Sequence, residues 1–169
     1  GIRSSVAIPN LTLSNASGNN PSARIWVEDL EVANDITIDN GSNFDADGND
    51  VYIGGDANIN GTYTPTGNST YFNGTADQQI NSSSTVSFYN LIKSTANILD
   101  INAQLSISNN LTINGGTLDD NSNSISLLGD LTNNAVHNYG GSGNGIVMEG
   151  SILQRITGSG NYGMLSINN

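Results

Sequence analysis

The chain has 169 residues, of which 36% are hydrophobic, 6% aromatic and 11% charged, and its four basic residues stand against 15 acidic ones for a net charge of −11. That length is enough for one domain with a buried core. The shortage of basic residues argues against binding to nucleic acid, and no apolar run is long enough to span a bilayer, so we expect no direct membrane insertion. The absence of cysteine excludes disulfides and thiolate sites.

Residues 1–29 are expected to hold the end of a preceding repeat or a capping coil. The segment NLTLS at 10–14 resembles NLIKS at 90–94, which belongs to a later part of the chain. Arg24 and Trp26 lie just before the first full repeat, where a terminal coil with atypical residues would close the stack. We therefore expect the first coil of the fold in this region.

We expect residues 30–104 and 105–169 to form a duplicated repeat of about 75 residues, with the second copy truncated. The matched segments are LEV at 30–32 with LSI at 105–107, ITI at 36–38 with LTI at 111–113, VYI at 51–53 with ISL at 125–127, and QQI at 78–80 with QRI at 154–156. Self-similarity at a fixed period is the signature of a stacked array. The duplication therefore predicts a repeat fold.

Within each copy, apolar residues recur every 20 or 21 positions and head short segments that alternate between apolar and polar residues. These residues are Leu30, Val51 and Phe72 in the first copy, and Leu105, Ile125 and Ile146 in the second. Such alternation is typical of a strand with one buried face. Gly, Asn and Asp follow nearly every segment, and these residues favour tight corners. The pattern predicts an all-β fold, a parallel, right-handed β-helix or β-solenoid with coils of about 20 residues.

Two segments have a looser composition and are expected to be loops that leave the coil. Residues 63–69 contain Pro65, and residues 137–144 contain a Gly-Ser run. The only histidine, His137, begins the second segment and has no acidic neighbour in the sequence. We expect it to be a loop residue rather than a metal ligand or a catalytic base.

One acidic segment is a candidate calcium site. Asp45, Asp47, Asn49 and Asp50 form a DxDGxD-like run, and Asp56 lies where an EF-like loop would close. Carboxylate and carbonyl oxygens are the ligands that calcium prefers. The same residue types are those that any tight corner uses, so a plain turn is the alternative.

The segments FNGT at 72–75, QI at 79–80 and FYNL at 88–91, followed by LSI at 105–107 and LTINGGTL at 111–118, resemble the repeats of giant secreted surface proteins of Bacteroidota. These include the gliding-motility and adhesin type that the type IX secretion system exports. The chain is also similar, more loosely, to filamentous-haemagglutinin β-solenoids. The resemblance implies an extracellular, elongated, adhesive or filament-forming protein at the cell surface, without catalysis.

We therefore expect a structural, non-catalytic module of a surface adhesin or filament, a stiff stalk whose partners are neighbouring copies or repeats of the same protein. A β-sandwich subunit of an extracellular fibre is one alternative, although hairpin folds have no reason to repeat core positions at a fixed interval. A carbohydrate-binding or polysaccharide-cleaving β-helix is another, although cleavage needs a basic residue beside clustered carboxylates. Surface glycans could stack on the interspersed tyrosines, which are Tyr52, Tyr63, Tyr71 and Tyr89.

Overall fold

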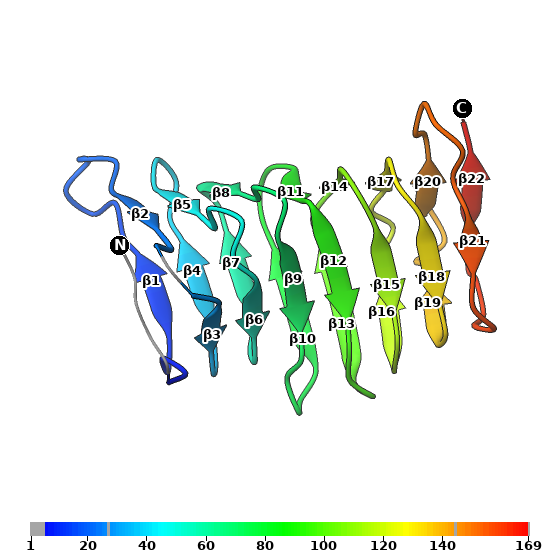
Figure 1. Ribbon diagram of the computed structural model, residues 1–169, viewed down its shortest axis with the longest axis horizontal. Coiled ribbons are helices and arrows are strands. Elements are labelled where there is room, and N and C mark those ends of the chain that lie inside the picture. Colours follow the sequence, from blue (N-terminus) through cyan, green and yellow to red (C-terminus); the bar gives the residue numbers. More distant parts are fainter. Residues whose placement is uncertain (1–5, 27, 144, 169) are drawn as a thin grey trace.

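The computed structural model describes residues 6–26, 28–143 and 145–168, which contain 22 short β-strands and no helix. The chain winds through three faces in turn, which we name A, B and C, and strands on one face pair in parallel from turn to turn. Figure 1 shows the successive turns side by side along the long axis. The fold is therefore a parallel β-solenoid, as the sequence predicts, and its parallel ladders exclude the β-sandwich.

Faces A and C are each one continuous sheet of seven strands. Face A has the order β1 (Leu11–Leu13), β4 (Ile36–Ile38), β7 (Ala57–Ile59), β10 (Gln78–Asn81), β13 (Ile98–Asn102), β16 (Thr117–Asp119) and β19 (Val136–Asn138). Face C has the order β3 (Leu30–Val32), β6 (Val51–Ile53), β9 (Ser69–Phe72), β12 (Asn90–Lys93), β15 (Leu111–Ile113), β18 (Leu131–Asn133) and β21 (Ile156–Thr157).

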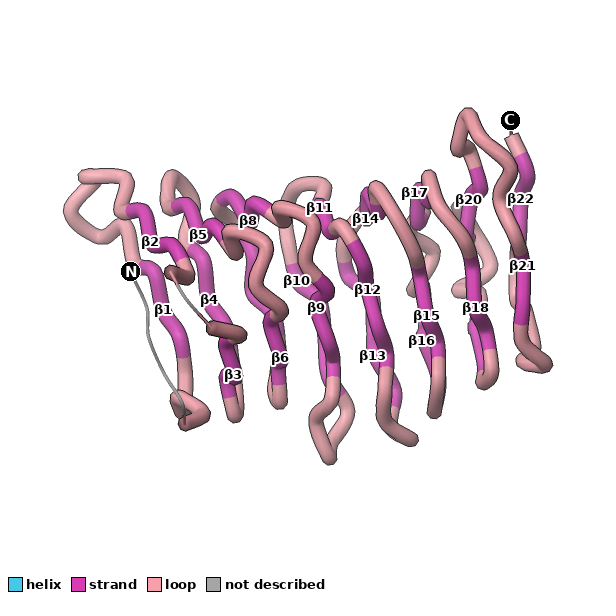
Figure 2. Tube along the Cα trace, viewed as in Figure 1, coloured by secondary structure: helices cyan, strands magenta, loops and turns pink. Residues whose placement is uncertain are grey.

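Face B consists of two sheets. The first contains β2 (Ser22–Arg24), β5 (Asn43–Asp45) and β8 (Thr62–Thr64). The second contains β11 (Val86–Phe88), β14 (Leu105–Ile107), β17 (Ile125–Leu127), β20 (Ile146–Met148) and β22 (Leu165–Ile167). Figure 2 shows these strands alternating with loops and turns around the coils. The stack has about seven turns, each of roughly 20 residues.

The core is a set of apolar columns that run along the inside of the stack. In most three-residue strands the first and third side chains are buried and the middle one points outward, as in β15, where Leu111 and Ile113 are fully buried. Leu105, Ile125 and Ile146 lie on one another in a single column, as predicted. Most inward-facing residues are thus apolar and most outward-facing ones polar, because the strands alternate with a period of two.

One column differs from the prediction. Leu30 lies on Val51, but the next residue in that column is Thr70, which Tyr63 contacts from the core side through a hydrogen bond of 2.8 Å. Phe72 stands two positions further along β9, on Ile53, in the neighbouring inner column. The sequence interval between paired residues of β6 and β9 is shorter than the constant interval that the sequence pattern suggested. Phe72 therefore lies in the neighbouring inner column.

Asparagine side chains form a ladder along face A of the stack. Asn81 donates to Asn58 Oδ1 at 3.0 Å, Asn102 donates to Asn81 Oδ1 at 2.9 Å, and Asn121 donates to Asn102 Oδ1 at 3.0 Å. Each amide therefore donates to the equivalent amide one coil earlier. Such ladders add side-chain hydrogen bonds to the backbone ladders in the same direction.

Carboxylates at the corners bond to the coil that follows. Asp29 Oδ1 accepts a hydrogen bond from the backbone N–H of Asp50 at 2.9 Å, and Asp50 Oδ1 accepts one from Ser69 at 2.7 Å. On the next edge, Asp35 Oδ1 accepts from the N–H of Asp56 at 2.8 Å. Part of the acidic excess therefore satisfies backbone donors between coils.

The two copies of the sequence repeat lie on different faces. The first copy, residues 30–104, contains the eleven strands β3 to β13, and eleven is not a multiple of the three strands in a turn. β3 consequently lies on face C, whereas its counterpart β14 lies on face B. The second copy thus repeats the local structure of the first after a rotation of one face about the axis.

The two segments expected to be loops are partly strand. Tyr63 and Thr64 belong to β8 and Ser69 begins β9, so only residues 65–68 connect the two strands. His137 and Asn138 likewise complete β19, and a loop follows them. Residue 144, at the end of the second predicted loop, lies outside the described residues.

Candidate functional site

The acidic segment predicted to bind calcium pairs with an arginine at one corner. The Arg24 guanidinium lies 2.7 Å from Asp45 Oδ2 and 3.7 Å from Asp47 Oδ2, and Asp45 Oδ1 accepts the N–H of Asp47 at 2.9 Å. Burial works against ionisation of Asp45, but the hydrogen bonds from Asp47 and Arg24 lower the pKa of its carboxyl below the ordinary value. The positive charge at this corner comes from Arg24.

The other three candidate ligands serve backbone groups. Asn49 Nδ2 donates to the carbonyl of Ala46 at 3.2 Å, and Asp50 and Asp56 each bond to the backbone of a neighbouring coil. Asp56 lies at the corner between β6 and β7, one strand further along than Asp50. Among the described residues, no group of three or more His, Cys, Asp or Glu side chains is arranged to hold a metal ion. Calcium at these residues stays a prediction.

The expectation that His137 is a loop residue was wrong. Its side chain points into the core from the centre of β19 and is 2% exposed, and its Nε2 lies 3.0 Å from Asp120 Oδ2. Asp120 Oδ1 also accepts the N–H groups of Ser122 and Gly140, both at 2.9 Å. Burial lowers the pKa of His137, and the hydrogen bond and charge of Asp120 oppose that shift. The pair is enclosed and fixes two turns to each other.

Lys93 is another polar side chain in the core. It stands in an inner column on face C between Phe72 and Ile113, and it is fully buried. Its ammonium group donates to Thr95 O at 2.5 Å and to Thr95 Oγ1 at 3.2 Å. Burial lowers the pKa of Lys93, and the charge of Asp77 opposes this. The stem fills the column while the ammonium reaches the corner.

Two of the tyrosines expected to contact glycans form an outer pair. The rings of Tyr52 and Tyr71 stack at a centroid distance of 4.5 Å on neighbouring strands of face C. For Tyr63 the expectation was wrong, because its ring is 6% exposed and its hydroxyl bonds to Thr70 and Asn68 inside the coil. This burial raises the pKa of Tyr63 to about 12.

A groove lies where face B is interrupted. β8 and β11 occupy neighbouring turns but belong to different sheets, and this is the only break in the three ladders of the described residues. The corner at 82–85 connects β10 to β11. β8 buries its middle residue, Tyr63, whereas β11 buries its first and third residues, Val86 and Phe88. The inward-facing pattern of face B therefore changes at the break.

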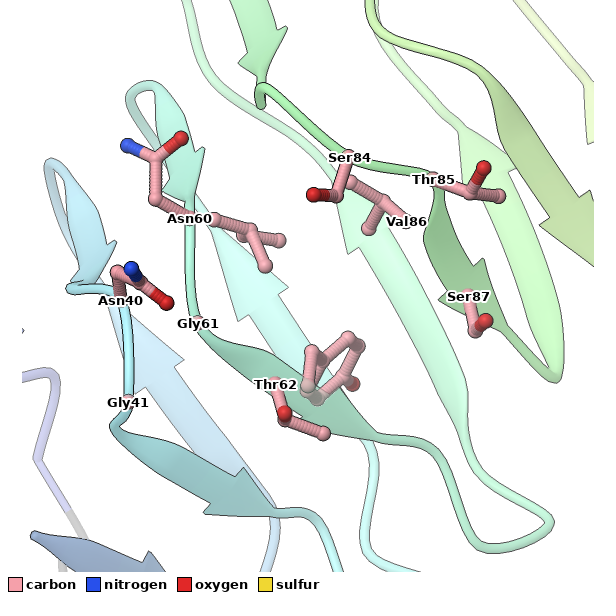
Figure 3. A pocket seen from close by; sticks show the side chains of 11 residues that line it. Asn40, Gly41, Asn60, Gly61, Thr62, Ser84, Thr85, Val86 and Ser87 are labelled. Atoms are coloured by element: carbon pink, nitrogen blue, oxygen red, sulfur yellow. The ribbon is translucent and has the colours of Figure 1, made fainter. Parts of the chain in front are cut away.

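The groove has a volume of about 420 Å³ and an uncharged lining. Figure 3 shows polar side chains around it, from the corners at residues 40 and 60 and from the segment that leads into β11. The complete lining is Asn40, Gly41, Ile59, Asn60, Gly61, Thr62, Tyr63, Ser84, Thr85, Val86 and Ser87. The sequence contained one signal for this site, which is the change in the buried position from the middle residue of TYT at 62–64 to the outer residues of VSF at 86–88.

A second hollow of about 300 Å³ lies on the other side of the same corner. Its lining is Ser82, Ser83, Ser84, Thr85, Asn102, Ala103, Gln104 and Asn123. The four-residue corner is therefore a ridge with a polar, uncharged depression on each side. Together these two depressions are the candidate functional site.

Comparisons with protein-family models, with curated proteins and with solved structures found no match to this chain. Among the described residues there is also no helix long and apolar enough to cross a membrane.

Proposed function

We propose that this chain is a structural, non-catalytic module of an extracellular surface fibre or adhesin, in which it acts as a stiff stalk. The observation that carries the proposal is the pair of seven-strand ladders on faces A and C, which run without a break from the first turn to the last. The asparagine ladder on face A and the carboxylates at the corners add further hydrogen bonds in the same direction.

Such an architecture transmits load along its axis. Each turn bonds to the turns above and below it, so stability is approximately a sum of interactions between neighbours. Length can therefore be added by duplication without a change in the core. The repeated sequence of residues 30–104 in residues 105–169 is consistent with growth of this kind.

Insertion of an additional copy of residues 30–104 between residues 104 and 105 should lengthen the rod by about 18 Å. The copy contributes eleven strands, which is about 3.7 turns of three strands, and each turn rises about 4.8 Å. Small-angle scattering would measure the increase in maximum dimension and the unchanged cross-section. A flexible Gly-Ser insert of equal length is the control, and two separate compact bodies instead of a longer rod would contradict the stalk.

The proposed partner at the end of the stalk is a second copy of the chain. The last strand of face B, β22, carries Ile167 on the buried Met148, and the side chain of Ile167 is 68% exposed. An open ladder with an exposed inner column is a surface on which another coil can stack. The first coil of a second copy presents the outer strands β1 and β2, together with Ile8, which pairs with Val32 on the outer side of β3.

The substitution Ile167→Glu should weaken end-to-end association at least tenfold, because a charge in the inner column would be buried by the next coil. Sedimentation equilibrium over a range of concentrations measures the association. Ile98→Glu is the matched control, since Ile98 is an exposed isoleucine in the middle of the stack. Equal loss in both variants, or no association of the unmodified chain, would count against end-to-end stacking.

The extracellular location of the protein is tested separately from its role as a stiff stalk. Antibodies against the folded module should label intact cells that make the protein, and protease added outside those cells should remove the label. Labelling only after the cells are opened would overturn the extracellular part of the proposal and leave the stalk intact.

A further inference from the structure

We propose that the groove between β8 and β11 binds a short segment of an uncharged saccharide. The groove is lined by Ser, Thr and Asn side chains together with glycine and a few apolar residues. This inference concerns a ligand site and does not depend on the stalk function.

The groove offers backbone hydrogen-bonding groups as well as side chains. The N–H of Thr62 bonds to Ser42 and the carbonyl of Thr64 accepts from Ala46, so these residues face β5, while the N–H of Val86 bonds forward to Gln104. Because alternate residues of a strand turn their backbone groups in opposite directions, those of Tyr63 and Ser87 face the break. These groups need partners from a ligand or from water.

The spacing of the strands excludes an extended peptide between them. β8 and β11 still have Cα atoms within 8 Å of each other. An additional strand would need about 9.6 Å between its two neighbours, which is twice the usual strand spacing. The occupant must therefore enter from the outside of face B and reach the backbone groups with small polar substituents, as the hydroxyl groups of a sugar ring do.

The charge distribution selects an uncharged ligand. The chain has 15 acidic residues, yet none of them lines the groove or the hollow beyond the ridge. A polyanion would meet the field of the net charge of −11 without a basic residue in the groove to bind it. A cation would find no carboxylate ligand there.

The side chains match the chemistry of a polyol. Thr62 and Ser87 point outward from β8 and β11, and Ser84, Thr85 and Asn60 rim the groove (Figure 3). Hydroxyl and amide groups both donate and accept hydrogen bonds, as sugar hydroxyls do. The volume of about 420 Å³ lies in the range of small-molecule sites. Tyr63 has its ring buried, so no exposed aromatic platform adds to the hydrogen bonds, and we expect millimolar affinity.

The test is an NMR titration of the complete, isotope-labelled chain with uncharged oligosaccharides of glucose, galactose, mannose and N-acetylglucosamine. At least one of them should shift the backbone amides of Tyr63 and Ser84–Ser87. Oligomers of a uronic acid should shift them less at equal concentration. Absence of any shift with all four sugars at tens of millimolar would overturn the proposal, as would shifts confined to the stacked pair Tyr52 and Tyr71.

Two conservative variants and a matched control test the assignment. Thr62→Val and Ser87→Ala each remove one exposed hydroxyl, and each should weaken binding about threefold to tenfold. Thr112→Val makes the same change on face C, away from the groove, and should leave affinity unchanged. Unchanged affinity in both groove variants would overturn the proposal. These residues point outward, so all three variants should fold.

Discussion

The variant Asp120→Ala is expected to lose about 3–5 kcal/mol of unfolding free energy. Asp120 is fully buried and accepts hydrogen bonds from Ser122 and Gly140 as well as contacting His137. Alanine would leave these groups in the core without the acceptor that the carboxylate supplies. Denaturant unfolding followed by circular dichroism would measure the change.

Asp120→Asn is the control for this prediction. The asparagine oxygen can still accept the two backbone N–H groups, and its amide can donate to a neutral His137. We expect a loss of only about 1–2 kcal/mol, because the hydrogen bonds remain while the charge is removed. Equal losses in the alanine and asparagine variants would show that the charge, rather than the hydrogen-bond acceptor, carries the stability.

Acidification should destabilise the protein through the same pair. Burial lowers the pKa of His137, so the folded state binds a proton less tightly than the unfolded state does. The contribution of neutral His137 to the unfolding free energy is therefore fully present above the ordinary histidine pKa of about 6.5, and it is lost as the pH falls below that value. Unfolding free energies measured between pH 5 and 8 should show this decrease, and it should be absent in His137→Gln.

The fold could be predicted from the sequence because its core signal repeats. The columns at Leu105, Ile125 and Ile146 are read from spacing alone, since each residue has the same environment one turn later. The corners were predictable for a similar reason, because Asn, Asp and Gly are favoured there by backbone chemistry. These features depend on residues close in sequence or at a constant interval.

The environment of His137 could not be read in this way. In β19 the polar His137 points inward while Val136 and Asn138 are exposed, which reverses the arrangement that the hydrophobic pattern favours. The orientation is set by pairing with β16, where His137 lies beside Leu118, and by Asp120 in the preceding turn. A strand of three residues carries too little pattern to fix its own register.

The role of the acidic residues was also hidden. Asp50 and Asp56 lie in a run whose composition resembles a calcium loop, but their oxygens accept backbone N–H groups one coil further on. Which N–H group each carboxylate accepts depends on which residues lie side by side in neighbouring coils. The rotation of the second copy has a comparable origin, because it follows from the number of strands in each repeat rather than from its sequence period.

Replacing Gln78 by Ala should cost about 2–4 kcal/mol of unfolding free energy, because this side chain closes a buried corner. Its Oε1 accepts the N–H of Gly74 at 3.0 Å, and its Nε2 donates to Ile53 O at 2.9 Å and to Gly55 O at 2.6 Å. The side chain is 1% exposed, so water has little access to the groups that it leaves behind. Denaturant unfolding measures the loss.

The chain contains its own control for this substitution. Gln154, the counterpart in the second copy, makes the same three contacts, accepting from Gly150 at 2.9 Å and donating to Leu127 O at 3.0 Å and to Gly129 O at 2.6 Å. It is half-buried and lies just before β21, the last strand of face C, where a turn can open locally without unfolding the rest. Gln154→Ala should therefore lower the free energy of global unfolding by about 1 kcal/mol or less, and it should speed amide exchange only near β21. Equal global losses for the two variants would show that the terminal turn unfolds together with the centre, and that the stack is a single cooperative unit rather than a sum of neighbouring turns.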